Sequence, residues 1–121
     1  MTKIVLIVDD SPTEVHKLTA MLKKHGHSVI VAENGEMGVK AAKAEKPDLI
    51  LMDIVMPGMN GFQATRQLSK AKETSHIPVI IVTTKDQEVD RMWGTRQGAK
   101  GYMTKPVQER DLISLINQVM G

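Results

Sequence analysis

The sequence of 121 residues predicts an α/β fold made of five consecutive strand–helix units. Two observations lead to this prediction. Five short apolar runs are continuous rather than alternating, as is typical of strands buried on both faces of a parallel sheet. The segments between these runs carry apolar residues at helical spacing, together with residues that cap helices. Strict alternation of strand and helix predicts a parallel sheet with helices on both of its faces.

The five strands are expected where Ile, Val and Leu cluster. They are residues 4–8, 29–32, 49–52, 79–82 and, as the weakest run, 101–103. Five parallel strands in about 120 residues favour the flavodoxin-like strand order 2-1-3-4-5. The predicted protein is therefore a three-layer (βα)5 sandwich.

The first helix is the best defined by its capping residues. Ser11 is a good N-cap, Pro12 suits the first helical position, and Glu14 completes the pattern of a capping box. Gly26 is expected to end this helix. Its apolar positions are Val15, Leu18, Met21 and Leu22.

Four more helices are expected after the remaining strands, over about residues 34–46, 61–71, 86–97 and 107–121. Asn34 and Pro106 mark the start of the first and the last of these. Their apolar positions are Met37, Val39, Ala41 and Ala42; Phe62, Ala64, Thr65 and Leu68; Val89, Met92 and Trp93; and Val107, Leu112, Leu115, Ile116 and Val119.

Length and composition exclude several classes of protein. With 41% hydrophobic and 25% charged residues, the chain has a soluble globular profile and is long enough for one domain. A net charge of +2 and a scarcity of aromatic residues give no case for a nucleic-acid surface. The absence of cysteine excludes disulfides and thiol catalysis. We expect no membrane insertion, because no apolar run reaches the length of a span and no signal-peptide pattern opens the chain.

Polar residues follow the predicted strands at the carboxyl edge of the sheet, where open α/β sheets bind their ligands. Asp9 and Asp10 follow the first strand, and Asp53 follows the third. Thr83 closes the fourth strand and Lys105 follows the fifth. Three converging carboxylates would repel one another unless a divalent cation lay between them, and oxygen ligands of this kind suit Mg²⁺.

This set of residues is suited to phosphoryl transfer. A metal-bound carboxylate can attack phosphorus and form an acyl phosphate, while cations and donors stabilise the phosphoryl oxygens. Asp53 is the expected nucleophile, since it comes from the central strand and an accessible Pro-Gly loop follows it. The backbone carbonyl of Val55 is placed to add a metal ligand, and Lys105 and Thr83 to contact the phosphoryl group. Taken alone, an Asp pair is more often a solvated turn, and Lys105 a solvated lysine.

Four motifs in this order resemble those of the receiver domain of two-component response regulators. They are Val8-Asp9-Asp10-Ser11, Met52-Asp53-Ile54-Val55-Met56-Pro57-Gly58-Met59-Asn60-Gly61, Val82-Thr83-Thr84 and Thr104-Lys105-Pro106. The resemblance covers essentially the whole chain. We therefore expect residues 1–121 to be one receiver domain without a separate output domain.

The resemblance implies a role for each matched residue. Asp53 would be the phosphoacceptor and would bind Mg²⁺, or Mn²⁺, together with Asp9 and Asp10. Lys105 would contact the phosphoryl group, and the peptide bond before Pro106 would be cis.

Five residues have further roles that the resemblance implies or leaves open. Thr83 and Tyr102 would form the switch that reports phosphorylation. Val55 and Lys85 occupy the two positions that tune hydrolysis of the acyl phosphate, and Val55 offers no group to orient water. Trp93 is either an anchor for a partner or, more often, a residue packed with Met92 in the core or in a groove.

A closer resemblance, carried by residues 10–14, 60–68 and 81–88, is to single-domain twitching-motility regulators of type IV pilus chemosensory systems. It implies a cytoplasmic bacterial protein, a monomer or weak dimer, phosphorylated by a chemotaxis-like histidine kinase. It also implies a protein effector that docks on the face of the fourth helix, fifth strand and fifth helix. Such a module catalyses only its own phosphorylation and dephosphorylation.

Three alternatives have different support. An aspartyl-nucleophile phosphatase would require a second acid two residues after a nucleophilic Asp at the end of the first strand. Here Asp9 and Asp10 are adjacent, and Ser11 occupies the position two residues after Asp9. A receiver that only drains phosphate from a shared kinase remains open. A flavin or nucleotide carrier is disfavoured because no glycine-rich loop follows the first strand.

Overall fold

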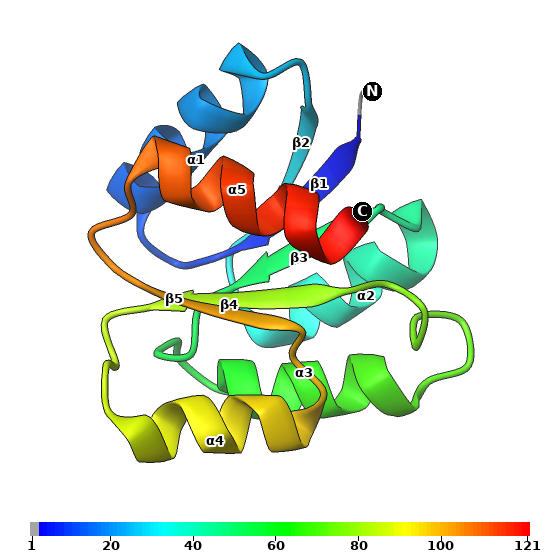
Figure 1. The fold of residues 1–121 in the computed structure, drawn as a ribbon. Helices are drawn as coiled ribbons and strands as arrows, with labels where there is room; N and C mark the ends of the chain where they lie inside the picture. The colour runs from blue at the N-terminus through cyan, green and yellow to red at the C-terminus, as the bar shows by residue number, and fades with distance from the viewer. Residues whose placement is uncertain (1–2) are drawn as a thin grey trace.

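The structure is a computed structural model that describes residues 3–121. Five strands and five helices alternate along the chain (Figure 1). They are β1 (Ile4–Val8), α1 (Pro12–Lys24), β2 (Ser28–Ala32), α2 (Gly35–Glu45), β3 (Leu49–Met52), α3 (Gly61–Lys70), β4 (Val79–Thr83), α4 (Glu88–Gln97), β5 (Gly101–Thr104) and α5 (Glu109–Met120).

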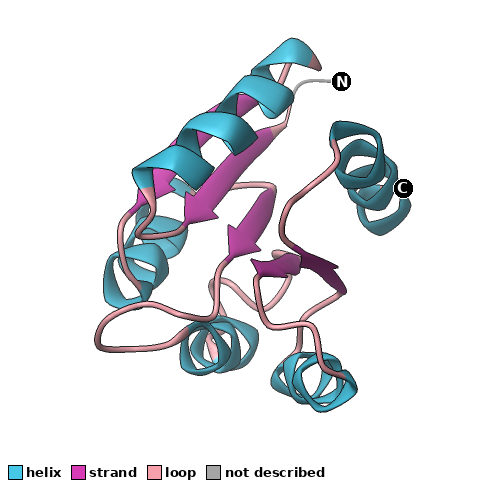
Figure 2. Cartoon of the chain, turned by 90° about the vertical axis from the view of Figure 1, so that its left-hand side faces the viewer, coloured by secondary structure: helices cyan, strands magenta, loops and turns pink. Residues whose placement is uncertain are grey.

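The strands form one parallel sheet in the order β2-β1-β3-β4-β5, which confirms the predicted topology. Helices lie on both sides of this sheet (Figure 2). The buried side chains of α1 and α5 pack on one face, and those of α2 and α3 pack on the other. The carboxyl ends of all five strands therefore meet at one edge, between the two helical layers.

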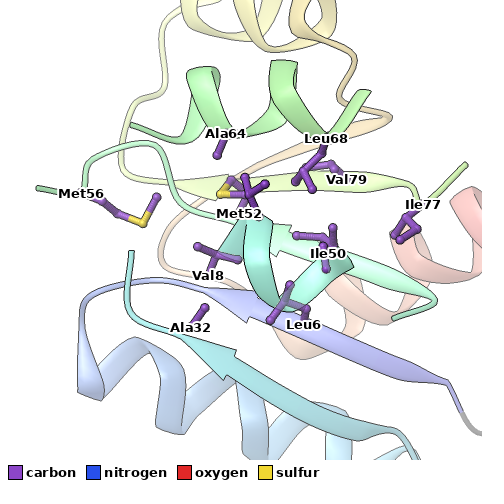
Figure 3. Close-up of a cluster of buried hydrophobic side chains, with 12 residues drawn as sticks. Leu6, Val8, Ala32, Ile50, Met52, Met56, Ala64, Leu68, Ile77 and Val79 are labelled. Carbon is purple, nitrogen blue, oxygen red and sulfur yellow. The ribbon is translucent and has the colours of Figure 1, made fainter. Parts of the chain in front are cut away.

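The core is divided by the sheet into two clusters. Leu6 and Val8 of β1 point to the side of α2 and α3, where Figure 3 shows them with Met52 and Leu68. Val5 and Ile7 belong to the cluster on the opposite face, beneath α1 and α5. Since alternate residues of a strand face opposite sides, a strand buried on both faces must be apolar throughout.

Burial of both faces is confirmed for the central strands and wrong for the edge strands. Every residue of β3 and β4 is buried. In β2, by contrast, Val31 is 45% exposed, and all four residues of β5 are only half-buried. A strand at the edge of a sheet has a neighbour on one side only, so its outer side chains remain accessible to solvent.

The start of α1 follows the prediction except for the capping box. The Ser11 hydroxyl accepts a hydrogen bond from the Glu14 amide at 3.3 Å, and Pro12 is the first helical residue. The Ser11 amide, however, donates to Oδ1 of Asp9 at 2.9 Å. Because Asp9 occupies this donor, Glu14 does not complete a capping box, and its carboxylate lies 3.9 Å from Lys17 instead.

Two helices approach the sheet closely at a glycine that apolar spacing does not predict, although Val39 and Ala42 of α2 pack in the core as predicted. Met37 of α2 is 47% exposed, while a Cβ on Gly38 would lie only 2.8 Å from the Val8 side chain. In α4 the same holds for Gly94, whose Cβ would lie 2.7 Å from Cδ1 of Ile81. The predicted apolar positions of α4 are 65%, 58% and 46% exposed, in the order Val89, Met92 and Trp93.

Helices α3 and α4 lie side by side on one face of the sheet (Figure 1) and are joined by a serine. The Ser69 hydroxyl lies 2.8 Å from the carbonyl oxygen of Thr65 in its own helix and 2.9 Å from that of Gln97. A side chain at Gly98, where φ is +111°, would collide with this hydroxyl. The contact attaches the last residue of α4 to α3.

Candidate functional site

The three predicted acids come together at the carboxyl edge of the sheet. Asp9 follows β1 and Asp53 follows β3, and the two strands are neighbours in the sheet. One carboxylate oxygen from each of Asp9, Asp10 and Asp53 lies within 4.8 Å of the others. Asp9 and Asp53 are 3% and 7% exposed, whereas Asp10 is open to solvent. Negative charge is thus concentrated at a site with little water around two of its carboxylates.

Lys105 reaches this cluster from the end of β5. Its Nζ lies 2.8 Å from Oδ2 of Asp9 and 3.3 Å from Oδ2 of Asp53. Burial acts to lower the pKa of Lys105, but the hydrogen bond to Asp9 and the charge of Asp53 outweigh it, so the pKa is raised. The ammonium group is therefore firmly charged. The Lys105–Pro106 peptide bond is cis, as the resemblance implies.

The Asp53 carboxyl group experiences opposing influences. Burial raises its pKa most, the charge of Lys105 lowers it, and the charge of Asp9 raises it again. The Thr83 hydroxyl and the amide of Ile54 stabilise the ionised form, the latter by donating to Oδ1 at 2.7 Å. The net pKa is raised, so the carboxylate carries its charge at a cost that a nearby cation would reduce.

A tightly packed loop follows Asp53. The Gly61 amide donates to the carbonyl oxygen of Ile54 at 3.0 Å. A Cβ on Gly61 would collide with the carbonyl of Asp53, and one on Gly35 would lie 2.7 Å from the carbonyl of Met59. The first residues of α2 and α3 thus support the loop from behind. Sequence reasoning missed Gly35 and gave Gly61 no packing role, although each glycine stands directly after a helix-capping asparagine.

The remaining predicted residues lie around the cluster rather than within it. Val55 is 55% exposed in the loop. Thr83 is fully buried at the end of β4, and its hydroxyl accepts a 3.4 Å hydrogen bond from the amide of Lys85. The Tyr102 hydroxyl donates to the carbonyl oxygen of Lys85 at 2.7 Å. Backbone atoms of Lys85 therefore connect the two predicted switch residues.

Trp93 does not reach the acidic cluster. It lies in a shallow groove with Asn60, Phe62 and Arg66 between α3 and α4. The guanidinium of Arg96 stands 5.7 Å from the centroid of the indole ring. With 46% of its surface exposed, Trp93 fits the groove-packing interpretation better than burial in the core.

The oxygen donors of this site match the preference of a small, hard divalent cation. Asp9, Asp10 and Asp53 provide carboxylate oxygens, and Mg²⁺ is typically held by a few such oxygens together with water. Lys105 provides a positive charge that could contact an oxyanion bound beside the metal. The arrangement is suited to hold a phosphoryl group against Asp53. Within residues 3–121, no helix combines the length and the apolar character needed to cross a membrane.

Comparison with known proteins gives consistent matches. The family model of the response regulator receiver domain matches residues 5–117. Protein PilH of Pseudomonas aeruginosa is 70% identical over 116 residues, which are 96% of each chain. The alkaline phosphatase synthesis transcriptional regulatory protein PhoP of Bacillus subtilis is 37% identical over 99% of this chain. The chain spans about half the length of PhoP, since the match covers 49% of that protein.

Solved structures match over the whole fold. The chemotaxis protein CheY4 of Vibrio cholerae has a TM-score of 0.91 at 26% identity, and the match covers 98% of this chain and 99% of CheY4. The receiver domain of a sensor histidine kinase of Pseudomonas aeruginosa PAO1 has a TM-score of 0.92 at 27% identity, covering 100% and 99% of the two chains. The latter structure has a magnesium ion coordinated in its active site cleft.

Proposed function

The chain belongs to the family of response regulator receiver domains, and from this membership we propose that it accepts a phosphoryl group on Asp53 from a histidine kinase. The observation that carries the proposal is the convergence of Asp9, Asp10 and Asp53 on one cluster with the ammonium group of Lys105 inside it. Receiver membership and the flavodoxin-like topology were both predicted from the sequence, and both are confirmed.

The three carboxylates and the backbone carbonyl of Val55 would hold Mg²⁺ in this proposal. When bound, Mg²⁺ supplies positive charge that neutralises a phosphoryl oxygen. The acidity of the site supports this assignment, because the raised pKa of Asp53 reflects a carboxylate that gains from an added cation. The same cation would also reduce the repulsion between Asp9 and Asp53.

The transfer step uses residues of this chain in distinct roles. A carboxylate oxygen of Asp53 attacks the phosphorus of a phosphohistidine, the new O–P bond forms, and the P–N bond breaks. The leaving imidazole nitrogen takes up a proton. In the unphosphorylated structure, Lys105 contacts Asp9 and Asp53. After transfer, its ammonium group would contact a phosphoryl oxygen and no longer the Asp53 oxygen. The Thr83 hydroxyl would donate to another.

Phosphorylation would then act on the face formed by α4, β5 and α5. The phosphoryl group adds about −1.5 to −2 charge and strong acceptor oxygens beside Thr83. A shift of the Thr83 hydroxyl toward these oxygens changes its contact with the Lys85 amide, and the Lys85 carbonyl holds Tyr102. The signal is a biased equilibrium between two arrangements of this face, which a partner protein reads.

The pathway is proposed from similarity alone. Identity of 70% over nearly the full length of PilH supports a place in a type IV pilus system that controls twitching motility. In that setting the donor is a chemotaxis-like histidine kinase in the cytoplasm, and the chain works as a monomer or weak dimer. The chain would act as a signalling module and not as an enzyme on external substrates.

Incubation with acetyl phosphate and Mg²⁺ tests the proposed acceptor. Intact-mass spectrometry should show the gain of one phosphoryl group in the wild type and in Asp111→Asn, an exposed acid on α5. The gain should be absent in Asp53→Asn and in the presence of EDTA. Phosphorylation that persists in Asp53→Asn would overturn the assignment, and rapid turnover of an external phosphomonoester would favour a phosphatase.

A second measurement separates an effector-driving receiver from one that only drains phosphate. The phosphorylated and unphosphorylated forms are immobilised and compared for retained protein, with Asp53→Asn as the control that cannot be phosphorylated. A partner retained only by the phosphorylated form supports signalling through a dedicated effector. If the two forms retain the same proteins, the phosphate-draining role is favoured.

A further inference from the structure

Tyr102 is held at three points, although it lies on an edge strand. Its hydroxyl donates to the carbonyl oxygen of Lys85 at 2.7 Å. Its ring packs against a small cluster that is centred on Ile81. Burial, followed by the charge of Asp90, raises the pKa of Tyr102 to about 12, so the hydroxyl remains a donor. The side chain is therefore turned toward the β4–α4 loop.

Arg91 of α4 supplies the third point. Its guanidinium carbon stands 4.9 Å from the centroid of the Tyr102 ring, within the range of a cation–π contact. Its Nη2 also donates to Oγ1 of Thr104 at 3.3 Å. Tyr102 and Thr104 are two residues apart on β5 and so face the same side. Arg91 thus covers the Tyr102 ring and is also hydrogen-bonded to β5, the strand that carries Tyr102.

Gly94 of α4 also borders the Tyr102 ring. It is buried on α4, one turn after Arg91, so both residues lie on the same face of the helix. A Cβ on Gly94 would lie 3.4 Å from Cδ2 of Tyr102 and 2.7 Å from Cδ1 of Ile81. A Cβ here would be in ordinary van der Waals contact with the ring, but it would force the end of the Ile81 side chain, against which the ring packs, to shift. We call the space between Arg91 and Gly94 the tyrosine slot.

The tyrosine slot is connected to Asp53 through a single backbone unit. The carbonyl oxygen of Lys85 accepts from Tyr102, and the amide of Lys85 donates to the Thr83 hydroxyl at 3.4 Å. Strand β4, which ends at Thr83, pairs with β3, which ends just before Asp53, so this hydroxyl lies at the same edge of the sheet as the acceptor. Any force that holds Tyr102 in the slot therefore also holds the Lys85 backbone and the Thr83 hydroxyl beside the acceptor.

We propose that Arg91 is a positioning residue that holds Tyr102 in the slot before phosphorylation, and so keeps the acceptor site partly assembled in the resting protein. This inference rests on the proposed function, because it states that Arg91 already favours the arrangement of Tyr102 that phosphorylation of Asp53 would favour further. Coupling between two sites is reciprocal. If Arg91 and a phosphoryl group favour the same arrangement, removal of Arg91 must weaken binding of a phosphoryl group at Asp53.

The binding of beryllofluoride, an analogue of a phosphoryl group, measures this coupling. In saturating Mg²⁺, we expect Arg91→Ala to bind beryllofluoride about two- to fivefold more weakly, as loss of a cation–π contact at an exposed site implies. Arg91→Lys retains the cation and should recover part of the affinity. The matched control is Arg96→Ala, which removes the corresponding contact to Trp93 on the same helix and should leave the affinity unchanged.

The position of the ring is measured separately. Tyr102 is the only tyrosine in the chain, so protein labelled with 3-fluorotyrosine gives a ¹⁹F resonance from this ring alone. Without beryllofluoride, the resonance of Arg91→Ala should move from the wild-type position toward that of a solvent-exposed ring.

The two measurements distinguish failure of this inference from failure of the proposed function. Identical ¹⁹F resonances and equal affinities in wild type and Arg91→Ala would overturn the role of Arg91. If no variant binds beryllofluoride, the proposed phosphoacceptor function fails, and the ¹⁹F comparison alone decides whether Arg91 positions Tyr102. A shifted resonance with unchanged beryllofluoride affinity would also overturn the inference, since the ring and the acceptor would then be uncoupled.

Discussion

Asp53 shows at the scale of one residue why this acidic site calls for a cation. Its carboxyl group is 7% exposed and lies close to a second buried acid, Asp9. Lys105 offsets part of the cost but is shared between the two carboxylates. One ammonium group facing two buried acids and the exposed Asp10 leaves an excess of negative charge. A divalent cation that binds here gains from interactions that the folded chain has already arranged.

Val55 sets the first residue-scale prediction, which concerns the lifetime of the acyl phosphate. An amide at this position can orient water, whereas the valine side chain cannot. Val55→Asn should therefore dephosphorylate about tenfold faster, less than the roughly 100-fold or more of full acid–base catalysis. The residue is 55% exposed, so the fold should tolerate the change. Decay of phosphorylated protein measures the rate, with Met37→Gln, a comparably exposed position on α2, as the control. A rate no faster than wild type would refute it.

His27 makes stability depend on pH at the opposite end of the molecule. Burial lowers its pKa from 6.5, with the charges of His25 and Lys3 acting in the same direction. The backbone amide of Lys3 also donates a hydrogen bond to Nδ1 at 3.3 Å, and only the neutral ring can accept it there. The folded state therefore binds this proton more weakly than the unfolded state does. The stabilisation is present above about pH 6.5 and is lost as the pH falls below it.

Urea unfolding at about pH 7.5 and about pH 5.5 measures this effect. The wild type should lose more stability between the two values than His27→Asn, in which the amide oxygen replaces Nδ1 as acceptor. His16→Asn, at an exposed position on α1, should behave as the wild type. Equal losses in the wild type and His27→Asn would show that another group is responsible.

At the scale of elements, the contact between α3 and α4 depends on one hydroxyl. Ser69 lies 2.9 Å from the carbonyl oxygen of Gln97, a residue that is 7% exposed. Ser69→Ala leaves that carbonyl without this donor and should lower the free energy of unfolding by about 1 kcal/mol. Ser114→Ala is the matched control because it makes the same change at an exposed helical position on α5. Chemical denaturation of both variants tests the prediction. Equal stabilities would show that the hydroxyl contributes nothing.

At the scale of the whole molecule, Mg²⁺ should stabilise the fold by mass action. A ligand that binds only the folded state at 100 times its dissociation constant adds about 2.7 kcal/mol. Thermal unfolding with Mg²⁺ and with EDTA should differ by several degrees in the wild type and in Asp111→Asn. Asp10→Asn, which removes the exposed acid of the cluster, should reduce this difference. A melting temperature independent of Mg²⁺ in the wild type would contradict the proposed site.

Much of the fold and the acidic cluster could be predicted because both follow from local pattern. Continuous apolar runs identify the central strands, and the rule that ligands bind at strand ends brings Asp9, Asp53 and Lys105 together. The packing of α4, and the closest approach of α2 to the sheet, could not be predicted, because Gly94 and Gly38 lie against the sheet where any side chain would collide. Hydrophobic spacing does not register that kind of contact, which depends on elements distant in the sequence.

The attachment of α4 to α3 also determines how α4 can move. Ser69 fixes the Gln97 end, and at the other end the helix starts beside the loop that carries Lys85. A helix of ten residues is about 15 Å long, so it acts as a lever with its fulcrum at the attached end. When this loop moves, the resulting displacement of α4 is greatest near Glu88 and nearly zero at Gln97. A protein bound to the first turn of α4 would therefore experience the whole displacement of the helix, whereas a protein bound to the last turn would experience almost none.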